Sequence, residues 1–299
     1  MEQIGSQLVR VGDDAAGAGL DRSALVAIGD YVAETLSGRT VRLGTRTSPM
    51  ALGQANHVAA LLKAISPGLS VEIVGIQTSG DRWQGDLAEL GGKGLFMKEI
   101  DRALLMGVVD AGVHCIKDVP GDVPLAAGTV FAAYLEREDV RDTMVWRSGS
   151  RYQSVEELPP GTRIGTSSVR RKAQLLRYRP DLHVDRIRGN VNTRLARLDA
   201  EQRHEALVLA CAGLRRIGME HRIGQILPLE VMCPAVGAGV VGVQCREIDK
   251  PMVELLRLLD HPATRTHIRA ERAMLHSLQG HCNSPIAGHC STTLDGQIS

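Results

Sequence analysis

The stretch VRLGTRTSPMALGQANHVAALLKAI, residues 41–65, contains the pattern that decides the fold. Residues 41–45 have the composition of a short strand and lead into an arginine and hydroxyl-bearing residues. Over 48–65, apolar residues recur at the helical period, and this periodicity predicts a helix. A strand, a polar turn and a helix in succession are the building unit of an α/β domain.

The same alternation continues along the chain. A first unit adds predicted strands over 70–78 and 110–116 and a predicted helix over 98–106. A second unit has predicted strands over 162–166, 183–189 and 205–213 and predicted helices over 167–179 and 191–201. After this unit, the sequence predicts a strand within 236–245 and helices over 253–259 and 264–278. This order predicts an α/β fold with largely parallel sheets.

Composition excludes several classes of protein. Among 299 residues, 35 basic and 34 acidic side chains leave a net charge of +1, which argues against nucleic-acid binding through bulk charge. The 43% hydrophobic content argues against disorder. We see no apolar run long enough for a membrane span and no secretory signal, so we expect a cytoplasmic protein. Six scattered cysteines without a C-x-x-C pair indicate neither a zinc site nor a disulfide scaffold.

Residues 1–40 differ from the rest and are interpreted as an N-terminal extension. They are rich in alanine, glycine and acidic residues. Within them, residues 21–36 place Leu25, Ile28, Val32 and Leu36 on one face at helical spacing, which predicts a short amphipathic helix.

Only six of the 35 basic residues are lysines, so arginine dominates. A GC-rich genome is one explanation, and binding of carboxylates or phosphates by guanidinium groups is the other. The positions favour binding, because arginines follow the ends of predicted strands, where ligands bind in open α/β sheets; they are Arg46, Arg170, Arg171, Arg188, Arg194, Arg215 and Arg216. We therefore expect an anionic ligand, most simply a polycarboxylate, in a cleft between two domains.

Other candidate residues lie at similar turns. Ser48 and Ser168 open predicted helices, where amides and hydroxyls bind anions, although a plain helix cap fits as well. Lys117 and Asp118 follow a strand and suit acid–base work, or form a surface ion pair. Lys93 lies in GGKGLF, which lacks the spacing of a nucleotide-binding loop and is interpreted as a mobile loop near the site.

Cys282 is the cysteine that does not fit a buried apolar position. It lies in the turn GHCNSP, residues 280–285, directly after His281. A loop cysteine beside a histidine is a candidate nucleophile or attachment point.

Nine ordered segments together resemble the porphobilinogen deaminase, or hydroxymethylbilane synthase, family. They are GTRTSPMALGQA (44–55), GGKGLFMKE (91–99), HCIKDVP (114–120), EREDVRD (136–142), GTSSVRR (165–171), RGNVNTRL (188–195), AGLRR (212–216), PAVGAGVVGVQCR (234–246) and AERAM (270–274). The resemblance implies two domains like those of periplasmic binding proteins and a small α/β third domain, here apparently truncated. The implied bounds are 41–137 plus 236–258 for domain 1, 138–235 for domain 2 and 262–299 for the partial domain 3.

The resemblance also implies a function. Enzymes of this family are transferases that join four porphobilinogen molecules head to tail into hydroxymethylbilane, with release of ammonia, in porphyrin and heme biosynthesis. It implies a dipyrromethane cofactor attached through Cys282, catalysis by Asp118 and a monomer without nucleic-acid or membrane partners. The resemblance implies that the cofactor is bound by Ser48, Lys117, Ser168, Arg170, Arg171 and Arg188. It implies that the substrate is bound by Arg46, Arg194, Arg216 and Lys93.

The chain departs from the family pattern at four of these motif positions. Cys115 stands where serine is usual, Glu89 where lysine is common, and Ala238 where glutamine is usual. His281 replaces a glycine, which would strain the turn if this position needs a positive φ. These departures leave open a degenerate paralogue that binds pyrrole carboxylates without turnover. A two-domain protein that only binds a small anion is less consistent, because it needs neither the cysteine turn nor the Lys117–Asp118 pair.

Overall fold

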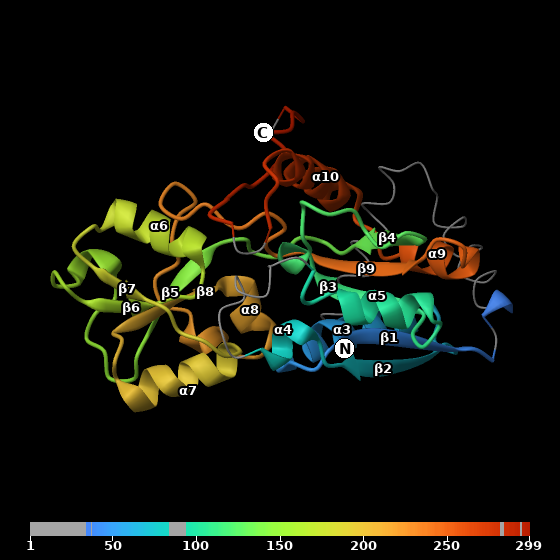
Figure 1. Cartoon of the computed structure of the whole chain (residues 1–299), viewed down its shortest axis with the longest axis horizontal. Helices are drawn as coiled ribbons and strands as arrows, with labels where there is room; N and C mark the ends of the chain where they lie inside the picture. The colour runs from blue at the N-terminus through green and yellow to red at the C-terminus, as the bar shows by residue number, and fades with distance from the viewer. Residues whose placement is uncertain (1–33, 37, 84–93, 282–283, 294) are drawn as a thin grey trace.

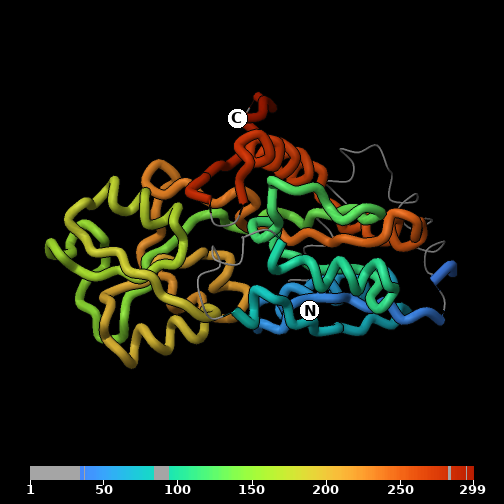
Figure 2. Tube along the Cα trace, in the orientation of Figure 1, coloured from blue at the N-terminus to red at the C-terminus, as the bar shows by residue number. Residues whose placement is uncertain are grey.

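The computed structural model describes residues 34–36, 38–83, 94–281, 284–293 and 295–299. Figures 1 and 2 show two α/β parts side by side, with the last helix lying over one of them. The predicted α/β class is therefore confirmed. Most of the helix predicted over 21–36 lies outside the described residues, as do Glu89, Lys93 and Cys282.

The first sheet has the strand order β2-β1-β3-β9-β4. Its strands are β1 (Thr40–Arg46), β2 (Ser70–Ile76), β3 (Ala111–Cys115), β4 (Thr129–Tyr134) and β9 (Val241–Arg246). β1 pairs in parallel with β2 and β3, whereas β9 is antiparallel to both β3 and β4. The prediction of a largely parallel sheet is confirmed, since β1, β2, β3 and β4 run in one direction. β9 is the exception, because it returns from the second sheet and inserts between two strands that run the other way.

The second sheet has the order β5-β8-β6-β7. It consists of β5 (Asp142–Trp146), β6 (Arg163–Gly165), β7 (His183–Asp185) and β8 (Ala206–Ala210). β6 is parallel to β7 and β8, and β5 is antiparallel to β8. As in the first sheet, the antiparallel strand is one that a crossover connection joins to the other sheet.

Helices cover both sheets. They are α3 (Pro49–Ile65), α4 (Ser79–Arg82), α5 (Lys98–Leu105), α6 (Val169–Tyr178), α7 (Val191–Glu201), α8 (Cys211–Arg216), α9 (Lys250–Arg257) and α10 (Pro262–Ser277), with short 3-10 turns η2 (Ile116–Asp118), η3 (Val155–Glu157) and η4 (Glu220–Arg222). Three predictions need correction, and the first is the strand predicted over 183–189, which ends at Asp185. The strand predicted over 205–213 ends at Ala210, and α8 begins at Cys211; the strand predicted within 236–245 begins only at Val241.

Two crossover connections join the sheets: 135–141 leads from β4 to β5, and 232–240 leads back to β9. They lie against each other, because Glu138 N–H donates to the Gly239 carbonyl and Arg137 Nε donates to the Ala238 carbonyl, both at 3.0 Å. Gly239 has a φ of 78°, and a Cβ there would lie 2.4 Å from the Glu138 carbonyl oxygen. Only glycine lets the two connections approach this closely.

Each sheet has its own apolar core. In the first, Val58 and Leu62 of α3 pack with Leu43 of β1 and Leu255 of α9. In the second, Leu175 of α6 packs with Ile164 and Val208 of the sheet. The α3 helix begins at a Ser48 cap followed by proline, and its buried residues recur at the helical period that the sequence displays.

The C-terminal region, predicted to be a partial third domain, consists in the described residues of α10 and an extended segment with one isolated bridge, Thr292 to Ile298. Ile268 of α10 is fully buried among residues that include Ile116 and Phe131 of the first domain. This region therefore packs directly above η2, where the sequence places Asp118. No helix in the described part of the chain is long and apolar enough to span a membrane.

Candidate active site

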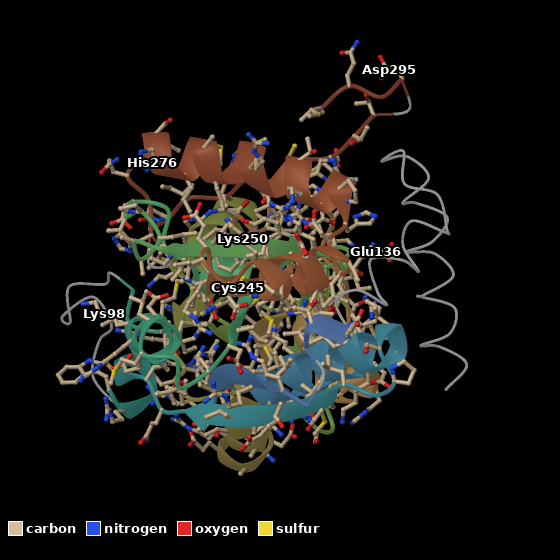
Figure 3. All side chains as sticks on the ribbon, turned by 90° about the vertical axis from the view of Figure 1, so that its right-hand side faces the viewer. Lys98, Glu136, Cys245, Lys250, His276 and Asp295 are labelled. Carbon is tan, nitrogen blue, oxygen red and sulfur yellow. The ribbon has the colours of Figure 1, made fainter. Side chains whose placement is uncertain are left out.

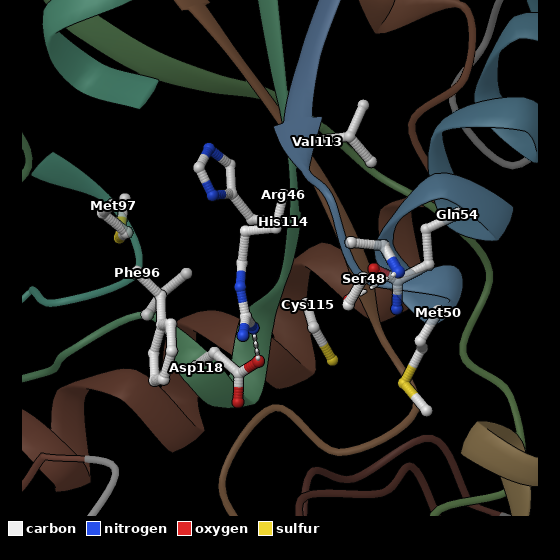
Figure 4. A pocket seen from close by; sticks show the side chains of 12 residues that line it. Arg46, Ser48, Met50, Gln54, Phe96, Met97, Val113, His114, Cys115 and Asp118 are labelled. Atoms are coloured by element: carbon white, nitrogen blue, oxygen red, sulfur yellow. Dashed lines mark hydrogen bonds and ion pairs between the residues drawn. The ribbon is translucent and has the colours of Figure 1, made fainter. Parts of the chain in front are cut away.

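A pocket opens where β1 and β3 end side by side in the first sheet (Figure 4). It encloses about 420 Å³, including space open to solvent, and is lined by Arg46, Ser48, Met50, Ala51, Gln54, Phe96, Met97, Val113, His114, Cys115, Asp118 and Val119. Three predicted site residues, Arg46, Ser48 and Asp118, therefore share one pocket. This position matches the carboxyl ends of parallel strands.

Arg46 is the last residue of β1 and is held from two sides. Its Nε lies 3.1 Å from both carboxylate oxygens of Asp81, and Nη2 lies 2.5 Å from Oδ1. The guanidinium also lies 4.0 Å from the centroid of the Phe96 ring. Burial lowers the pKa of Arg46, but Asp81 and Asp118 more than offset this and raise it, so the group stays charged. The sequence analysis missed Asp81; the Thr78-x-x-Asp81 spacing of a capping box was the available signal.

Asp118 closes the short η2 turn, and its carboxylate lies beside the Arg46 guanidinium in the pocket (Figure 4). Its Oδ2 lies 3.5 Å from Arg46 Nη1, and 35% of its side chain is exposed. Since Arg46 makes its shorter contacts with Asp81, the Asp118 carboxylate keeps lone pairs available to a ligand. Lys117, half-buried, precedes it but is not one of the described residues that line this pocket.

The pocket also holds buried polar groups that sequence analysis did not single out. Gln54 of α3 is 4% exposed and His114 of β3 is 6% exposed. Within the described part of the chain, Gln54 Nε2 and His114 Nε2 have no hydrogen-bond partner. Burial lowers the pKa of His114 to about 4, so its ring is neutral at neutral pH. Ser48 caps α3, its Oγ accepting the Ala51 N–H at 3.3 Å.

A second group of predicted residues gathers at the ends of β6 and β7. Ser168 caps α6 and accepts the Arg171 N–H at 3.4 Å. Burial and the nearby charges of Arg171 and Arg188 lower the pKa of Arg194 to about 10. Burial is the larger cause, but the contribution of two like charges shows that positive charge is concentrated here, which favours an anion.

Arg170 and Arg171 are also structural. Asp142, at the start of β5, is 2% exposed and accepts from Arg170 Nη2 at 2.7 Å and from Arg171 Nε and Nη2 at 3.0 and 2.7 Å. Arg170 Nη1 donates to the Cys233 carbonyl, and Arg171 Nη1 donates to the Val208 carbonyl at 3.0 Å. The two arginines thus bind protein acceptors that tie α6 to β5, β8 and the second crossover.

Arg216 ends α8 and reaches from the second part of the chain to the first. Its Nε donates to Glu138 at 2.7 Å, Nη2 to the Gly239 carbonyl at 3.0 Å, and Nη1 lies 3.8 Å from Cys115 Sγ. Cys115 lines the pocket, so Arg216 lies at its edge. Glu138, its partner, was another residue that sequence analysis missed.

Besides Cys115, two further departures from the family pattern can be placed. Ala238 is 7% exposed, between Gly237 and Gly239, so the position contributes no polar side chain. At 281, the histidine N–H donates to Ser284 Oγ at 3.0 Å. The non-glycine residues with positive φ in the described chain are Gln202 and Gln279, so His281 does not carry the strain considered above.

The fold and the site define an α/β protein with cationic groups at the carboxyl ends of two sheets and a carboxylate in the pocket of the first. Comparison with known proteins is more specific. Residues 41–254 match the family model "Porphobilinogen deaminase, dipyromethane cofactor binding domain". The chain belongs to the porphobilinogen deaminase family.

Similar proteins include porphobilinogen deaminase 2 of Streptomyces coelicolor, 51% identical over 259 residues that span 87% of this chain and 82% of that one. Porphobilinogen deaminase of Pelobacter propionicus is 46% identical over 84% of this chain and 79% of its own. Among solved structures, the methionine binding protein MetQ aligns over 84% of this chain and 99% of its own, with 13% identity and a TM-score of 0.44.

Proposed function

We propose that this protein is a hydroxymethylbilane synthase, a transferase that polymerises four porphobilinogen molecules into hydroxymethylbilane with release of ammonia. Family membership supports this activity. The observation that carries it is the pairing of Arg46 and Asp118 in one pocket, with a second cationic cluster around Arg194. Each porphobilinogen brings two carboxylates, so every added unit needs further cationic partners.

The residues present fit a dipyrromethane cofactor. Its carboxylates suit the cluster of Arg171, Arg188 and Arg194, and the buried amide of Gln54 offers a donor inside the pocket. When bound, the group supplies a pyrrole α-carbon to which the first substrate unit is joined. The predicted holding residues are Ser48, Lys117, Ser168, Arg170, Arg171 and Arg188.

The chain's own residues then act on the substrate. Asp118 accepts hydrogen bonds from pyrrole N–H groups and stabilises the positive charge that develops on the substrate as ammonia leaves. Arg46 is held by Asp81 and Phe96 and binds a substrate carboxylate beside Asp118. Arg194, Arg216 and Lys93 complete the predicted substrate contacts. Because Arg46 is held independently of Asp118, carboxylate binding and charge stabilisation are separable functions.

Covalent attachment through Cys282 is part of the proposal, as are the domain bounds given above, the monomeric state and the cytoplasmic location. The two sheets, formed by residues 40–134 with 241–246 and by residues 142–210, support the division into domains 1 and 2. The attachment rests on the position of Cys282 in the family motif.

Intact mass spectrometry of protein expressed in a porphobilinogen-producing host tests the attachment. We expect a mass increase equal to one dipyrromethane, absent from the Cys282→Ser variant and retained in a Cys233→Ser control. An unmodified mass for the parent protein would instead support the degenerate paralogue. An adduct that persists in Cys282→Ser would contradict the choice of cysteine while leaving the activity in place.

A further inference from the structure

The last helix, α10, packs against the turn that carries Asp118. Figure 3 shows α10 lying across the first domain, with His276 labelled on it. Residues at helical spacing form one face of this helix, namely Ile268, Arg272, Leu275 and His276. The face is turned toward domain 1, because Ile268 is fully buried and Leu275 is 8% exposed.

Arg272 binds the two carbonyl groups that directly follow Asp118. Its Nη1 donates to the Val119 carbonyl at 3.2 Å, and its Nη2 donates to the Pro120 carbonyl at 3.0 Å. Because both donors belong to one planar guanidinium, the pair of bonds fixes the orientation of this backbone as well as its position. Burial lowers the pKa of Arg272, and its hydrogen-bond acceptors among the described residues are these carbonyls rather than a carboxylate. The cation therefore holds backbone and does not neutralise an acid.

The same face of α10 contacts the next residue of the turn. The Gly121 carbonyl accepts from His276 Nδ1 at 3.0 Å. A Cβ at Gly121 would lie 2.6 Å from Leu275 Cγ, so glycine is what lets the helix approach this closely. Three successive carbonyl groups, those of residues 119–121, are therefore bound by α10.

The second crossover holds the start of this turn. Ile116 N–H donates to the Val240 carbonyl at 3.0 Å. Gly237 has a φ of 76°, and a Cβ there would lie 2.9 Å from the Lys117 backbone nitrogen. The turn is thus fixed at its start by the crossover and at its end by α10. Asp118 lies between these two points, with its side chain in the pocket (Figure 4).

We propose that Arg272 is a positioning residue that fixes the Asp118 carboxylate in the pocket. The inference rests on the proposed function, because it takes Asp118 as the catalytic residue. A backbone movement at Val119 is passed directly to Asp118, and a displacement of about 1 Å at a catalytic group can lower turnover by about 10²-fold. Arg46 is held by Asp81 and not by α10, so substrate-carboxylate binding is separate from this positioning.

Steady-state kinetics of the cofactor-loaded protein test the proposal. We expect Arg272→Gln to lower kcat by at least about tenfold and to leave KM within about twofold of the parent, because Arg46 stays in place. Arg272→Lys keeps a charged donor and should recover part of the loss. Arg269→Gln, the same substitution on the exposed side of α10, should match the parent. A fall in kcat that occurs only with loss of the cofactor adduct, as measured by intact mass, would overturn the proposal.

A second substitution at Asp118 separates positioning from stability. In the Asp118→Ala background, we expect Arg272→Gln to change the residual turnover by less than about twofold, because the carboxylate to be positioned is gone. The same relative loss of turnover in both backgrounds would show that Arg272 only stabilises the fold, and would reject its positioning role.

Hydrogen exchange gives a readout that does not need turnover. We expect amide exchange over 116–121 to rise by at least about fivefold in Arg272→Gln and to stay at the parent's rate in Arg269→Gln. Circular dichroism establishes that each variant is folded. A parent without synthase activity would contradict the proposed function, whereas exchange still reports whether Arg272 holds the turn. Unchanged exchange in a folded Arg272→Gln protein would overturn the inference itself.

Discussion

Asp118 is the residue whose environment says most about its chemistry. Among the described residues it pairs with Arg46, whose Nη1 is 3.5 Å away, whereas Arg46 Nε lies 3.1 Å from Asp81. Asp118 is therefore not needed to position Arg46. It keeps a carboxylate directed at the pocket, and 35% of its side chain is exposed. This arrangement suits a group that contacts substrate better than a structural ion pair.

Replacing Asp118 by alanine should consequently abolish most turnover without unfolding the site. We expect kcat to fall by about 10²–10³, the usual cost of losing one group that stabilises developing charge. The cofactor should remain attached, as measured by intact mass, because Arg46 and the second cluster are untouched. Glu72→Gln, on the exposed edge strand β2, is the control. Activity within tenfold of the parent would remove Asp118 from its proposed role.

Asp142 is a buried carboxylate that neutralises both Arg170 and Arg171. Both arginines hold its pKa at about 2 despite burial, so the carboxylate is charged at neutral pH. Asp142→Asn leaves two buried guanidinium groups without their counter-ion, and we expect roughly 3–5 kcal/mol of lost stability in urea unfolding. Glu201→Gln, in an exposed pair with Arg197, should change little. A small effect of Asp142→Asn would mean that these arginines mainly serve a ligand.

At the scale of elements, hydrophobic periodicity predicted the helices well. It did not predict the structure of segments in which every residue is apolar. The helix predicted over 48–65 is α3, Pro49–Ile65, and that predicted over 264–278 is α10, Pro262–Ser277. In EALVLACAG, residues 205–213, neighbouring apolar residues show no period. The change from β8 to α8 depends on tertiary packing instead: Gly213 of α8 lies against Met50 of α3, where a Cβ would come within 3.1 Å of the Met50 methyl.

The sequence points to the arginines that the structure places in and beside the pocket, but not to the residues that pair with them. Arg46 ends β1, Ser48 lies two residues beyond it, and Arg216 ends the short helix that follows β8; a single sequence displays these positions. Asp81, Glu138 and Glu271 pair with arginines 35, 78 and 134 residues away, and no local pattern encodes such pairings. The buried amide of Gln54 was likewise hidden, because its importance lies in having no partner in the described chain.

The crossovers give a prediction at this scale. Gly239→Ala puts a Cβ 2.4 Å from the Glu138 carbonyl oxygen, and the backbone there has a φ of 78°. Gly128→Ala is a matched control, because Gly128 has a φ of 79° but open space around it. Both variants carry roughly 1–2 kcal/mol of left-handed strain, and only Gly239→Ala adds the clash. Thermal unfolding should show a clearly lower midpoint for Gly239→Ala; equal midpoints would contradict the tight crossover contact.

At the scale of the whole molecule, Glu271 of α10 joins three regions. It is 3% exposed, and its two oxygens accept from Arg137 at 2.7 and 2.9 Å, while the N–H groups of Gly237 and Cys290 donate to it at 2.7 Å. One carboxylate therefore binds both crossovers and the C-terminal segment to α10. Burial opposes its charge, but His289, Arg137 and the Gly237 N–H hold its pKa at about 2.

Because the pKa of Glu271 is lower in the folded state than in the unfolded state, acid lowers the stability of the protein. The unfolded carboxyl titrates near 4.5 and the folded one near 2, so the unfolded state takes up the proton first as pH falls. The stabilisation is complete above about pH 5 and is lost progressively toward pH 2. Glu271→Gln removes this charge and should lower the free energy of unfolding by roughly 3–5 kcal/mol at pH 7. This is the usual effect of removing one partner of a buried ion pair.

Urea unfolding of the parent and Glu271→Gln at pH 7, 5, 4 and 3 tests this expectation. The difference in unfolding free energy should be constant between pH 7 and 5 and shrink as the pH falls below about 4.5, because the parent then loses the charge that the variant lacks. Glu254→Gln, on the exposed face of α9, should follow the parent at every pH. A difference that stays constant down to pH 3 would mean that the ionised carboxylate is not what binds the crossovers to α10, and that the joint depends on packing around Ile268 instead.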